Sequence, residues 1–341
     1  MKLPAVFERY RSAIDAEMRS ALADHASPMY DMLRYHLGWV DRRGQPAQQP
    51  SGKALRPTLC LLACESTRTD PHTVLPAAAA IEMVHNFSLI HDDIQDDDQE
   101  RHHRPTVWAL WGKPQAINAG TAMRVLASLT LLRLVDRGVS VQQQLRALRL
   151  MDESCLRLIE GQYLDISFES RIDIVVRDYL SMIEGKTATL MACSLEMGAM
   201  LGSGDERTIE ALRAYGLNLG FAFQIRDDVL GIWGEEEKTG KPVGSDIRRR
   251  KKSFPIVFAL EKAEGKARTE LERIYRDKSS MDGAVATVLD ILDQVRAGRE
   301  SQALAERYRD AALAKIAGIE LPQRARQDLE EMATFLAERD H

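Results

Sequence analysis

Residues 76–98 read PAAAAIEMVHNFSLIHDDIQDDD, a long apolar segment that runs directly into a cluster of carboxylates. Its apolar residues recur every three or four positions and cover most faces of the helix that this spacing predicts. A helix that is apolar on most faces belongs inside a bundle of helices. The sequence therefore predicts an interior helix over residues 76–95 whose last turn is acidic.

This acidic end holds five carboxylates within the seven residues 92–98. Asp92 and Asp96 are four residues apart, so they stack one turn apart on a helix, and Asp93 flanks them. Carboxylates this close repel one another unless a cation lies among them. Mg2+ fits this role, because it binds a few carboxylates, keeps several waters and completes its shell with substrate phosphates. For this cluster alone, a solvated charged helix end is an equally good explanation.

A second acidic pair, Asp227-Asp228, follows within another apolar helical segment, residues 208–233. Metal and ligand sites in helical bundles are built from side chains that project inward from interior helices. Two acidic clusters in two interior helices are harder to explain as solvated charge than one cluster is. We therefore expect both clusters to bind a shared divalent cation.

The composition describes a water-soluble globular protein. The chain has 341 residues, 45% of them hydrophobic and 28% charged, with a net charge of −5. This allows a sizeable core, and the lack of a basic excess argues against binding to nucleic acid. Helical spacing of apolar residues recurs almost everywhere, while alternating β-branched runs are nearly absent, which predicts an all-α chain. Because the breaks between helices are short, we expect one domain over residues 1–341.

The cysteines and the N-terminal segment do not indicate a metal site, a disulfide framework or a targeting signal. The four cysteines show no CxxC spacing, so neither a zinc site nor a disulfide framework is supported. The N-terminal segment lacks the apolar core of a signal peptide. No run reaches the roughly 18–20 uninterrupted apolar residues that a membrane span needs. We expect a cytoplasmic protein without a membrane span.

Basic residues gather near the acidic clusters, at junctions between loops and helices. They are Lys53, Arg56, Arg101, Arg104, Lys186, Lys241 and the run from Arg248 to Lys252. Cations placed on several sides of an acidic metal site are what a bound diphosphate requires. The glycine-containing loop around Lys241 is not a nucleotide-binding P-loop, because no strand precedes it and the Lys-Ser/Thr pair is missing. We expect it to be a flap whose lysine reaches a phosphate.

Taken in order, these motifs resemble those of the trans-isoprenyl diphosphate synthase family over about residues 50–255. The matching motifs are Gly52-Lys53-x-x-Arg56-Pro57, His85, Asp92-Asp93-x-x-Asp96, Arg101, Arg104-Pro105-Thr106, Gly161-Gln162-x-x-Asp165, Lys186-Thr187, Phe223-Gln224-x-x-Asp227-Asp228 and Thr239-Gly240-Lys241. The resemblance implies an all-α fold: a single large orthogonal helical bundle of the isoprenoid synthase type around a deep central cavity. It also implies a homodimer.

The activity that the resemblance implies is head-to-tail condensation of isopentenyl diphosphate with an allylic diphosphate. Mg2+, as three ions when the allylic diphosphate is bound, would be held by Asp92, Asp96 and Asp227, with Asp93 and Asp228 in support. The implied catalytic residues are Asp92, Asp93, Lys186, Thr187 and Gln224. The implied substrate-binding residues are Lys53, Arg56, His85, Arg101, His102, Lys186, Gln224, Lys241 and Lys251.

Four positions depart from the family pattern: His102, His103, Gly231 and Thr121, the last without an assigned role. His102 stands where the family usually has a second arginine, and Gly231 stands where the second acidic motif usually has a third aspartate. A histidine is only partly charged near pH 7. We therefore expect weaker binding of isopentenyl diphosphate unless Arg104 compensates.

Product length is predicted from the residues just before the first acidic motif. Phe87 lies five residues before Asp92, roughly 7.5 Å of helix rise, and the neighbouring Ser88 is small. An aromatic side chain at this depth resembles the cavity floor of medium-chain synthases. The absence of a two-residue insertion between Asp93 and Asp96 resembles the geranylgeranyl type rather than bacterial farnesyl synthases, which favours a C20 geranylgeranyl product. A farnesyl or a longer product is the alternative, and Phe87 as an ordinary core residue is the other explanation for this position.

Two other functions fit part of the pattern. A class I terpene cyclase shares the aspartate-rich helix, but the Asn/Ser/Glu metal triad that would replace the second aspartate pair is not visible. A non-catalytic partner subunit would explain His102 and Gly231, although the retained acidic and basic motif residues argue against it.

Overall fold

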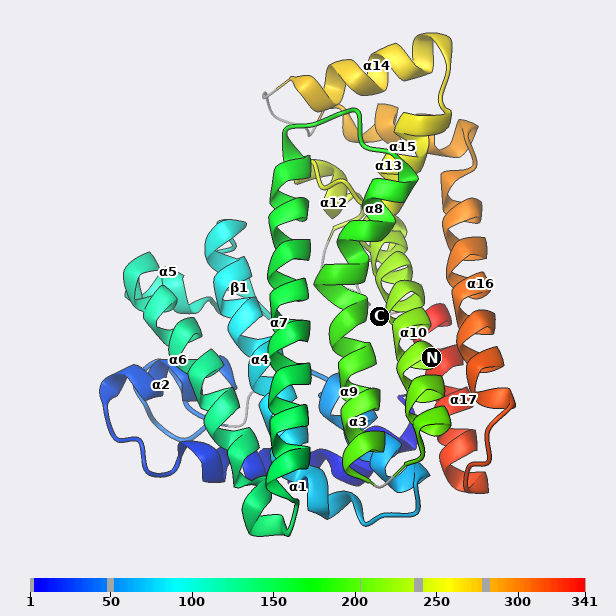
Figure 1. The fold of residues 1–341 in the computed structure, drawn as a ribbon. Helices are drawn as coiled ribbons and strands as arrows, with labels where there is room; N and C mark the ends of the chain where they lie inside the picture. Colours follow the sequence, from blue (N-terminus) through cyan, green and yellow to red (C-terminus); the bar gives the residue numbers. More distant parts are fainter. Residues whose placement is uncertain (1–2, 48–51, 203, 236–241, 278–282, 341) are drawn as a thin grey trace. The chain divides into compact units, whose positions relative to one another are not determined.

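The computed structural model describes residues 3–47, 52–202, 204–235, 242–277 and 283–340, which are almost entirely helical (Figure 1). In these ranges the extended structure is limited to a small hairpin, β1 (Glu100–Arg101) and β2 (Arg104–Pro105), and an isolated bridge. The prediction of an all-α chain is confirmed.

The chain divides into two compact units. We call residues 5–152 with 194–209 the N-terminal unit, and residues 1–4, 153–193 and 210–341 the C-terminal unit. Three helices continue from one unit into the other along the chain: α7 (Val141–Glu169), α9 (Thr189–Leu201) and α10 (Glu206–Trp233). One domain over residues 1–341 stays a prediction.

The N-terminal unit is built around α4 (Leu75–Gln95), which packs against α1, α3 and α6 (Figure 1). Residues 77–80 are four consecutive alanines with 0% exposure, so the helix is covered on every side at this level. The interior helix predicted over residues 76–95 is confirmed. The other elements of this unit are α1 (Ala5–Leu22), α2 (Pro28–His36), α3 (Leu55–Ser66), η1 (Pro71–Val74), α5 (Val107–Trp111), α6 (Lys113–Leu132) and η2 (Arg133–Arg137).

Among the described residues, Pro71–Gln95 is the one helical segment long and apolar enough to cross a membrane. Its apolar window is 78% buried within the protein. That burial is expected of the core helix of a globular protein, which passes the same length and composition test.

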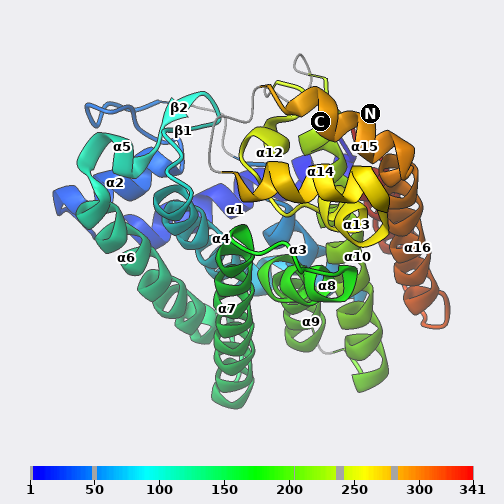
Figure 2. The ribbon, with the colours of Figure 1, turned by 90° about the horizontal axis from the view of Figure 1, so that it is seen from above.

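In the C-terminal unit, α13 (Phe254–Lys262) packs against α8, α14, α15 and α16 (Figure 2). One apolar cluster around Leu260 joins α13 to α14 and α15, and another around Val257 joins α13 to α8 and α10. The remaining elements are α8 (Val176–Ile183), η3 (Glu184–Ala188), α12 (Ser245–Arg248), α14 (Gly265–Arg276), α15 (Val285–Gln294), α16 (Ala297–Ala317) and α17 (Gln323–Glu338).

Apolar spacing in the sequence predicts one continuous helix over residues 178–201, but the structure contains an interruption there. A π-helical turn, η3, separates α8 from α9 and contains Lys186 and Thr187. Periodicity could not reveal it, because one extra residue per turn barely changes the apolar spacing. Such turns occur often at functional sites.

Candidate active site

The first acidic cluster occupies the C-terminal end of α4. The amide N–H of Asp96 donates to the carbonyl of Asp92 at 2.8 Å, so the two residues are one helical turn apart, as predicted. Asp92 is half-buried and Asp96 is exposed. The helix ends here because Asp97 adopts a φ of 53°, the left-handed conformation common just after a helix end.

Asp93 is buried, with 1% of the residue exposed. Arg101 donates to its Oδ1 through Nε at 2.8 Å and contacts the same atom through Nη2 at 2.7 Å. Its Oδ2 is buried and has no hydrogen-bond partner. Burial raises the pKa of Asp93 to about 6, although the charge of Arg101 opposes this shift.

A tight hairpin carries Arg101. Strands β1 and β2 are joined by the two residues His102 and His103, which have φ values of 52° and 59°. Two positive φ values in a two-residue loop define a type I′ turn, whose twist matches that of the strands. Asn and Gly are the usual residues there, and His tolerates this conformation better than most side chains do. His102, a predicted substrate-binding residue, is therefore at the exposed tip of the hairpin.

Tyr35 of α2 fixes this hairpin in place. Its hydroxyl donates to the carbonyl of Pro105 at 2.8 Å, and its own carbonyl accepts a hydrogen bond from Arg104 Nη2 at 2.8 Å. The guanidinium of Arg104 also lies 4.2 Å from the centroid of the Tyr35 ring. These contacts limit the movement of Arg101 relative to α2 and α4.

The predicted basic residues Arg56 and His85 lie near Arg101. Arg56 is buried at the start of α3, and burial lowers its pKa to about 10 although Glu82 of α4 opposes this. Burial, with the charges of Arg56 and Arg101, holds the pKa of His85 well below its usual range. The sequence missed His36, which also acts on His85 electrostatically. Lys53 precedes α3 and is half-buried.

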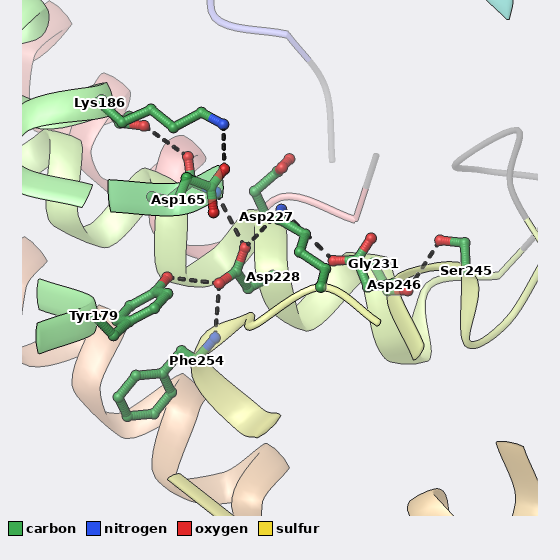
Figure 3. Close-up of polar contacts among 12 residues, drawn as sticks. Asp165, Tyr179, Lys186, Asp227, Asp228, Gly231, Ser245, Asp246 and Phe254 are labelled. Carbon is green, nitrogen blue, oxygen red and sulfur yellow. Dashed lines mark hydrogen bonds and ion pairs between the residues drawn. The ribbon is translucent and has the colours of Figure 1, made fainter. Parts of the chain in front are cut away.

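In the second acidic cluster, Asp228 is 1% exposed and surrounded by donors (Figure 3). Its Oδ2 accepts from the Tyr179 hydroxyl at 2.6 Å and from the Phe254 N–H at 2.8 Å. Its Oδ1 accepts from Gln224 Nε2 at 3.1 Å and from Lys251 Nζ at 3.3 Å. Both oxygens are thus engaged by the protein, so Asp228 joins α8, α10 and α13.

Asp227 is much more accessible, with 49% of its side chain exposed. Arg339, just after α17, donates to its Oδ1 at 2.7 Å and lies over the Phe223 ring at 4.4 Å. Asp227 is therefore the member of this pair that is available to a ligand from solvent.

Gly231 is one turn beyond Asp227, at the position of the missing third acid. The carboxylate of Asp246 occupies the space beside it. A Cβ at Gly231 would lie 2.2 Å from Oδ2 of Asp246, so even alanine would displace this carboxylate. Asp246 Oδ2 is 3.7 Å from Lys251 Nζ, and Ser245 Oγ donates to the carbonyl of Gly231 at 3.1 Å (Figure 3). The start of α12 therefore packs directly on α10.

Lys186 owes its position to two glycines that allow α7 and η3 to touch. A Cβ at Gly161 would lie 2.1 Å from the backbone nitrogen of Lys186, and one at Gly185 would lie 2.7 Å from a carbonyl of α7. This close approach brings Lys186 Nζ into an ion pair with Asp165 of α7 (Figure 3). Burial alone would raise the pKa of Asp165, but the charges of Lys186 and Lys251 outweigh it and lower this pKa.

Thr187 links the same turn to α10. Its hydroxyl donates to Oε1 of Gln224 at 2.8 Å, which orients the Gln224 amide so that its nitrogen donates to Asp228. The predicted residues Lys186, Thr187 and Gln224 thus belong to one hydrogen-bonded network.

The residues predicted for product length are in the core of the N-terminal unit. Phe87 is 6% exposed, and its ring meets that of His91 edge to face at a centroid distance of 5.7 Å. Ser88 is buried and donates to the carbonyl of His85 at 2.8 Å.

Most of these residues can be identified from the sequence, whereas several residues that hold them in place cannot. Lys241 is outside the described residues. The residues without a predicted role are His36, Asp165, Tyr179, Asp246 and Arg339. Asp246 had a visible signal, an acid beside the basic run 248–252, whereas Tyr179 and Arg339 looked like ordinary members of amphipathic helices.

Comparison with known proteins finds the same family in sequence relatives and in solved structures. Residues 38–292 match the polyprenyl synthetase family model. The chain is 42% identical to (2E,6E)-farnesyl diphosphate synthase of Mycobacterium tuberculosis, over 93% of this chain and 88% of that protein. It is 38% identical to geranylgeranyl diphosphate synthase of the same species, over 92% and 88%. A solved structure of a polyprenyl synthetase from Streptomyces coelicolor A3(2) superposes with a TM-score of 0.91 at 39% identity, covering 98% of this chain and 99% of that one.

We predict that Gly161→Ala destabilises the protein and displaces Lys186. The new methyl group would overlap the backbone of η3, and overpacking of this kind costs about 1–3 kcal/mol. The melting temperature should fall by several degrees. Gly283→Ala is the control, because no atom lies within 4 Å of a Cβ at that position. Equal melting temperatures for the two variants would show that the contact between α7 and η3 is not tight.

Proposed function

The chain belongs to the polyprenyl synthetase family, and from this premise we propose how its residues act in a trans-prenyltransferase. The reaction joins isopentenyl diphosphate head to tail with an allylic diphosphate and yields a medium-chain trans-polyprenyl diphosphate. The observation that carries the assignment is the pairing of a buried and an accessible aspartate in both acidic motifs, with Lys186 and Arg101 fixed beside them.

The difficult step is cleavage of a carbon–oxygen bond, which leaves pyrophosphate and an allylic cation. Positive groups that are already fixed in place stabilise the charge that develops on the leaving group. Arg101 and Lys186 are such groups, since each is oriented by an ion pair with a carboxylate. Oε1 of Gln224 and the hydroxyl of Thr187 offer dipoles to the allylic cation, and no protein nucleophile is needed.

The accessible carboxylates fit Mg2+. In the described part of the chain, no three His, Cys, Asp or Glu side chains gather into a ready metal site. This suits Mg2+, which takes few carboxylates and keeps positions for water and phosphate oxygens. Asp92, Asp96 and Asp227 would hold the ions, and the unpartnered Oδ2 of Asp93 is the orphaned atom that a bound ion or its water would satisfy. Bound Mg2+ would neutralise the diphosphate as it leaves.

Isopentenyl diphosphate would bind without metal in the N-terminal unit, at Lys53, Arg56 and His85. Arg56 supports this assignment, because its Nε is buried and has no hydrogen-bond partner. An unsatisfied buried donor is costly unless a ligand completes it. His102, on the hairpin tip, would contribute a weaker charge than arginine does.

For the product we propose C20 geranylgeranyl diphosphate. The side chain of Phe87 fills the core one and a half turns below Asp92, where it would meet the growing chain. Relatives named for farnesyl and for geranylgeranyl diphosphate are similarly identical to this chain, so identity alone does not decide the length.

We also propose a cytoplasmic homodimer. Large apolar side chains are exposed along one side of α6 and along one side of α7, with Tyr163 70% and Leu145 61% exposed. The α6 residues are Ile117, Val125, Leu129 and Leu132, and the others on α7 are Val141, Leu156, Ile159 and Ile166. Large apolar side chains exposed along a helix face are typical of a protein–protein interface. A second copy of the chain would cover it.

We predict that the purified protein with Mg2+ and radiolabelled isopentenyl diphosphate elongates dimethylallyl, geranyl or farnesyl diphosphate, and that EDTA stops the reaction. Products are identified by mass. Pyrophosphate release without incorporation of label would indicate a cyclase instead. Failure with all three allylic substrates would support a non-catalytic subunit.

Replacement of Phe87 by alanine should lengthen the product, because it opens the floor beneath the first acidic motif. The measurement is the chain-length distribution by mass spectrometry, with Phe87→Leu as the conservative control. An unchanged distribution in Phe87→Ala would place the floor elsewhere.

A charge placed in the exposed apolar stripe should dissociate the dimer. We expect Ile159→Glu to shift the mass measured by analytical ultracentrifugation from two chains to one. Val175→Glu, which alters an exposed valine outside α6 and α7, should leave the mass unchanged. A monomeric unmodified protein would rule out the homodimer.

A further inference from the structure

Arg339, just beyond the end of α17, is buried against the second acidic motif. Its side chain is 9% exposed, whereas that of Asp227 is 49% exposed. Nη2 of Arg339 donates to Oδ1 of Asp227 at 2.7 Å, and Cζ lies 4.4 Å from the centroid of the Phe223 ring. Its Nε is buried and has no hydrogen-bond partner. Asp227 therefore supplies the negative charge that this buried cation needs.

The backbone of Arg339 is fixed independently of its side chain. Its carbonyl accepts from Arg226 Nε of α10 at 2.7 Å, and its N–H donates to the carbonyl of Phe335 at 2.9 Å. Arg226 is held in turn by Oε1 of Gln302 on α16, at 2.9 Å. Burial lowers the pKa of Arg226, and the charge of Arg339 adds to this shift. Arg339 thus acts on α10 from a defined position, and replacing its side chain would leave the backbone contacts in place.

This arrangement opposes the binding of a metal ion alone at Asp227. Mg2+ binds oxygen at about 2.1 Å, so an ion on Oδ1 would lie within about 5 Å of the Arg339 nitrogen. Like charges at this distance repel, and most strongly where burial excludes water. Withdrawal of Arg339 from Asp227 would instead leave a buried guanidinium without its counter-ion, which is also costly. In both cases Arg339 competes with the metal for this carboxylate.

A diphosphate that arrives with the metal would remove both costs. Its oxygens complete the shell of Mg2+, and its negative charge offsets the repulsion between the ion and Arg339. A guanidinium suits a phosphate, because its N–H groups form a planar fork that matches phosphate oxygens. The unpartnered Nε of Arg339 is a donor that such an oxygen would satisfy.

We propose that Arg339 is the internal counter-ion of Asp227 and makes Mg2+ binding there depend on a diphosphate. Without ligand, Arg339 neutralises the carboxylate and keeps the affinity for Mg2+ low. When Mg2+ and a diphosphate bind together, the guanidinium passes from Asp227 to a phosphate oxygen. The inference rests on the proposed function in assigning Mg2+ to Asp227. It requires only binding, and not the condensation.

Calorimetric titration with magnesium chloride alone tests the competition. We expect Arg339→Gln to bind Mg2+ about tenfold more tightly than the unmodified protein, the effect of removing one charge-assisted hydrogen bond from the carboxylate. The gain should vanish when Asp227→Asn is added, which assigns it to this carboxylate rather than to the first acidic motif. Arg339→Lys keeps the charge and should stay near the original affinity.

Arg309→Gln is the matched control. Arg309 of α16 pairs with Glu338 at the end of α17, so this variant breaks an ion pair close in sequence to Arg339 that does not include Asp227. It should bind Mg2+ like the unmodified protein. If Arg339→Gln does not fold, Arg339→Met retains an apolar stem against Phe223 and takes its place.

Titration of pyrophosphate into protein with saturating Mg2+ supplies the second readout. Arg339→Gln should bind pyrophosphate about tenfold more weakly, because the phosphate loses a charged donor. The same substitution would then tighten the binding of the metal and weaken that of the diphosphate. A general loss of structure would weaken both.

The outcomes separate the two proposals. Unchanged or weaker Mg2+ binding by Arg339→Gln would overturn the role of Arg339, even if condensation proceeds. Unchanged pyrophosphate binding would overturn the transfer of the guanidinium to phosphate. Opposite shifts that depend on Asp227, without condensation of any allylic substrate, would refute the proposed function and leave the role of Arg339 standing.

Discussion

Repulsion between adjacent carboxylates is the constraint on which this structure depends. Each acidic motif contains two neighbouring aspartates on a mostly apolar helix. The two differ in exposure and in hydrogen bonding. The second member of each pair, Asp93 or Asp228, is 1% exposed and held by donors, while the first, Asp92 or Asp227, remains accessible. One carboxylate thus holds its helix to neighbouring elements, and the other remains accessible to solvent.

Burying a carboxylate is costly unless donors replace its water. Asp228 has four such donors, including the backbone N–H of Phe254 and the hydroxyl of Tyr179. Burial still raises its pKa, against the charge of Lys251. Asp93 has Arg101 alone on one oxygen, and its other oxygen is unsatisfied. The first motif is therefore the less satisfied of the two, which is consistent with a greater dependence on a bound cation.

The sequence predicted what depends on local spacing and missed what depends on contacts between distant residues. Helical periodicity was enough to predict α4 and the stacking of Asp92 on Asp96. The π-helical turn at Lys186 depends on Gly161 of another helix, and no local pattern encodes that contact. The donors to Asp228 are similarly remote, since Tyr179 is 49 residues before it and Phe254 is 26 residues after it.

Gly231 illustrates how a motif can mislead. Read from the sequence, it is a lost third acid, whereas in the fold it makes room for the carboxylate of Asp246. The proximity of His36 to the basic residues could not be predicted from the sequence for a related reason. Its neighbours His85 and Arg101 come from elements far along the chain, and only packing shows that they act on one another.

The division of each pair into an anchor and a ligand is tested most directly by melting temperatures of Asp227→Asn and Asp228→Asn, measured with and without Mg2+ and pyrophosphate. Ligand binding raises the melting temperature of a folded protein. Asp228→Asn should melt several degrees lower without ligand, because an amide nitrogen would face donors that need an acceptor. Asp227→Asn should melt near the original temperature and lose most of the rise that Mg2+ and pyrophosphate cause. The reverse pattern, a destabilised Asp227→Asn and a stable Asp228→Asn that no longer responds to ligand, would contradict the account.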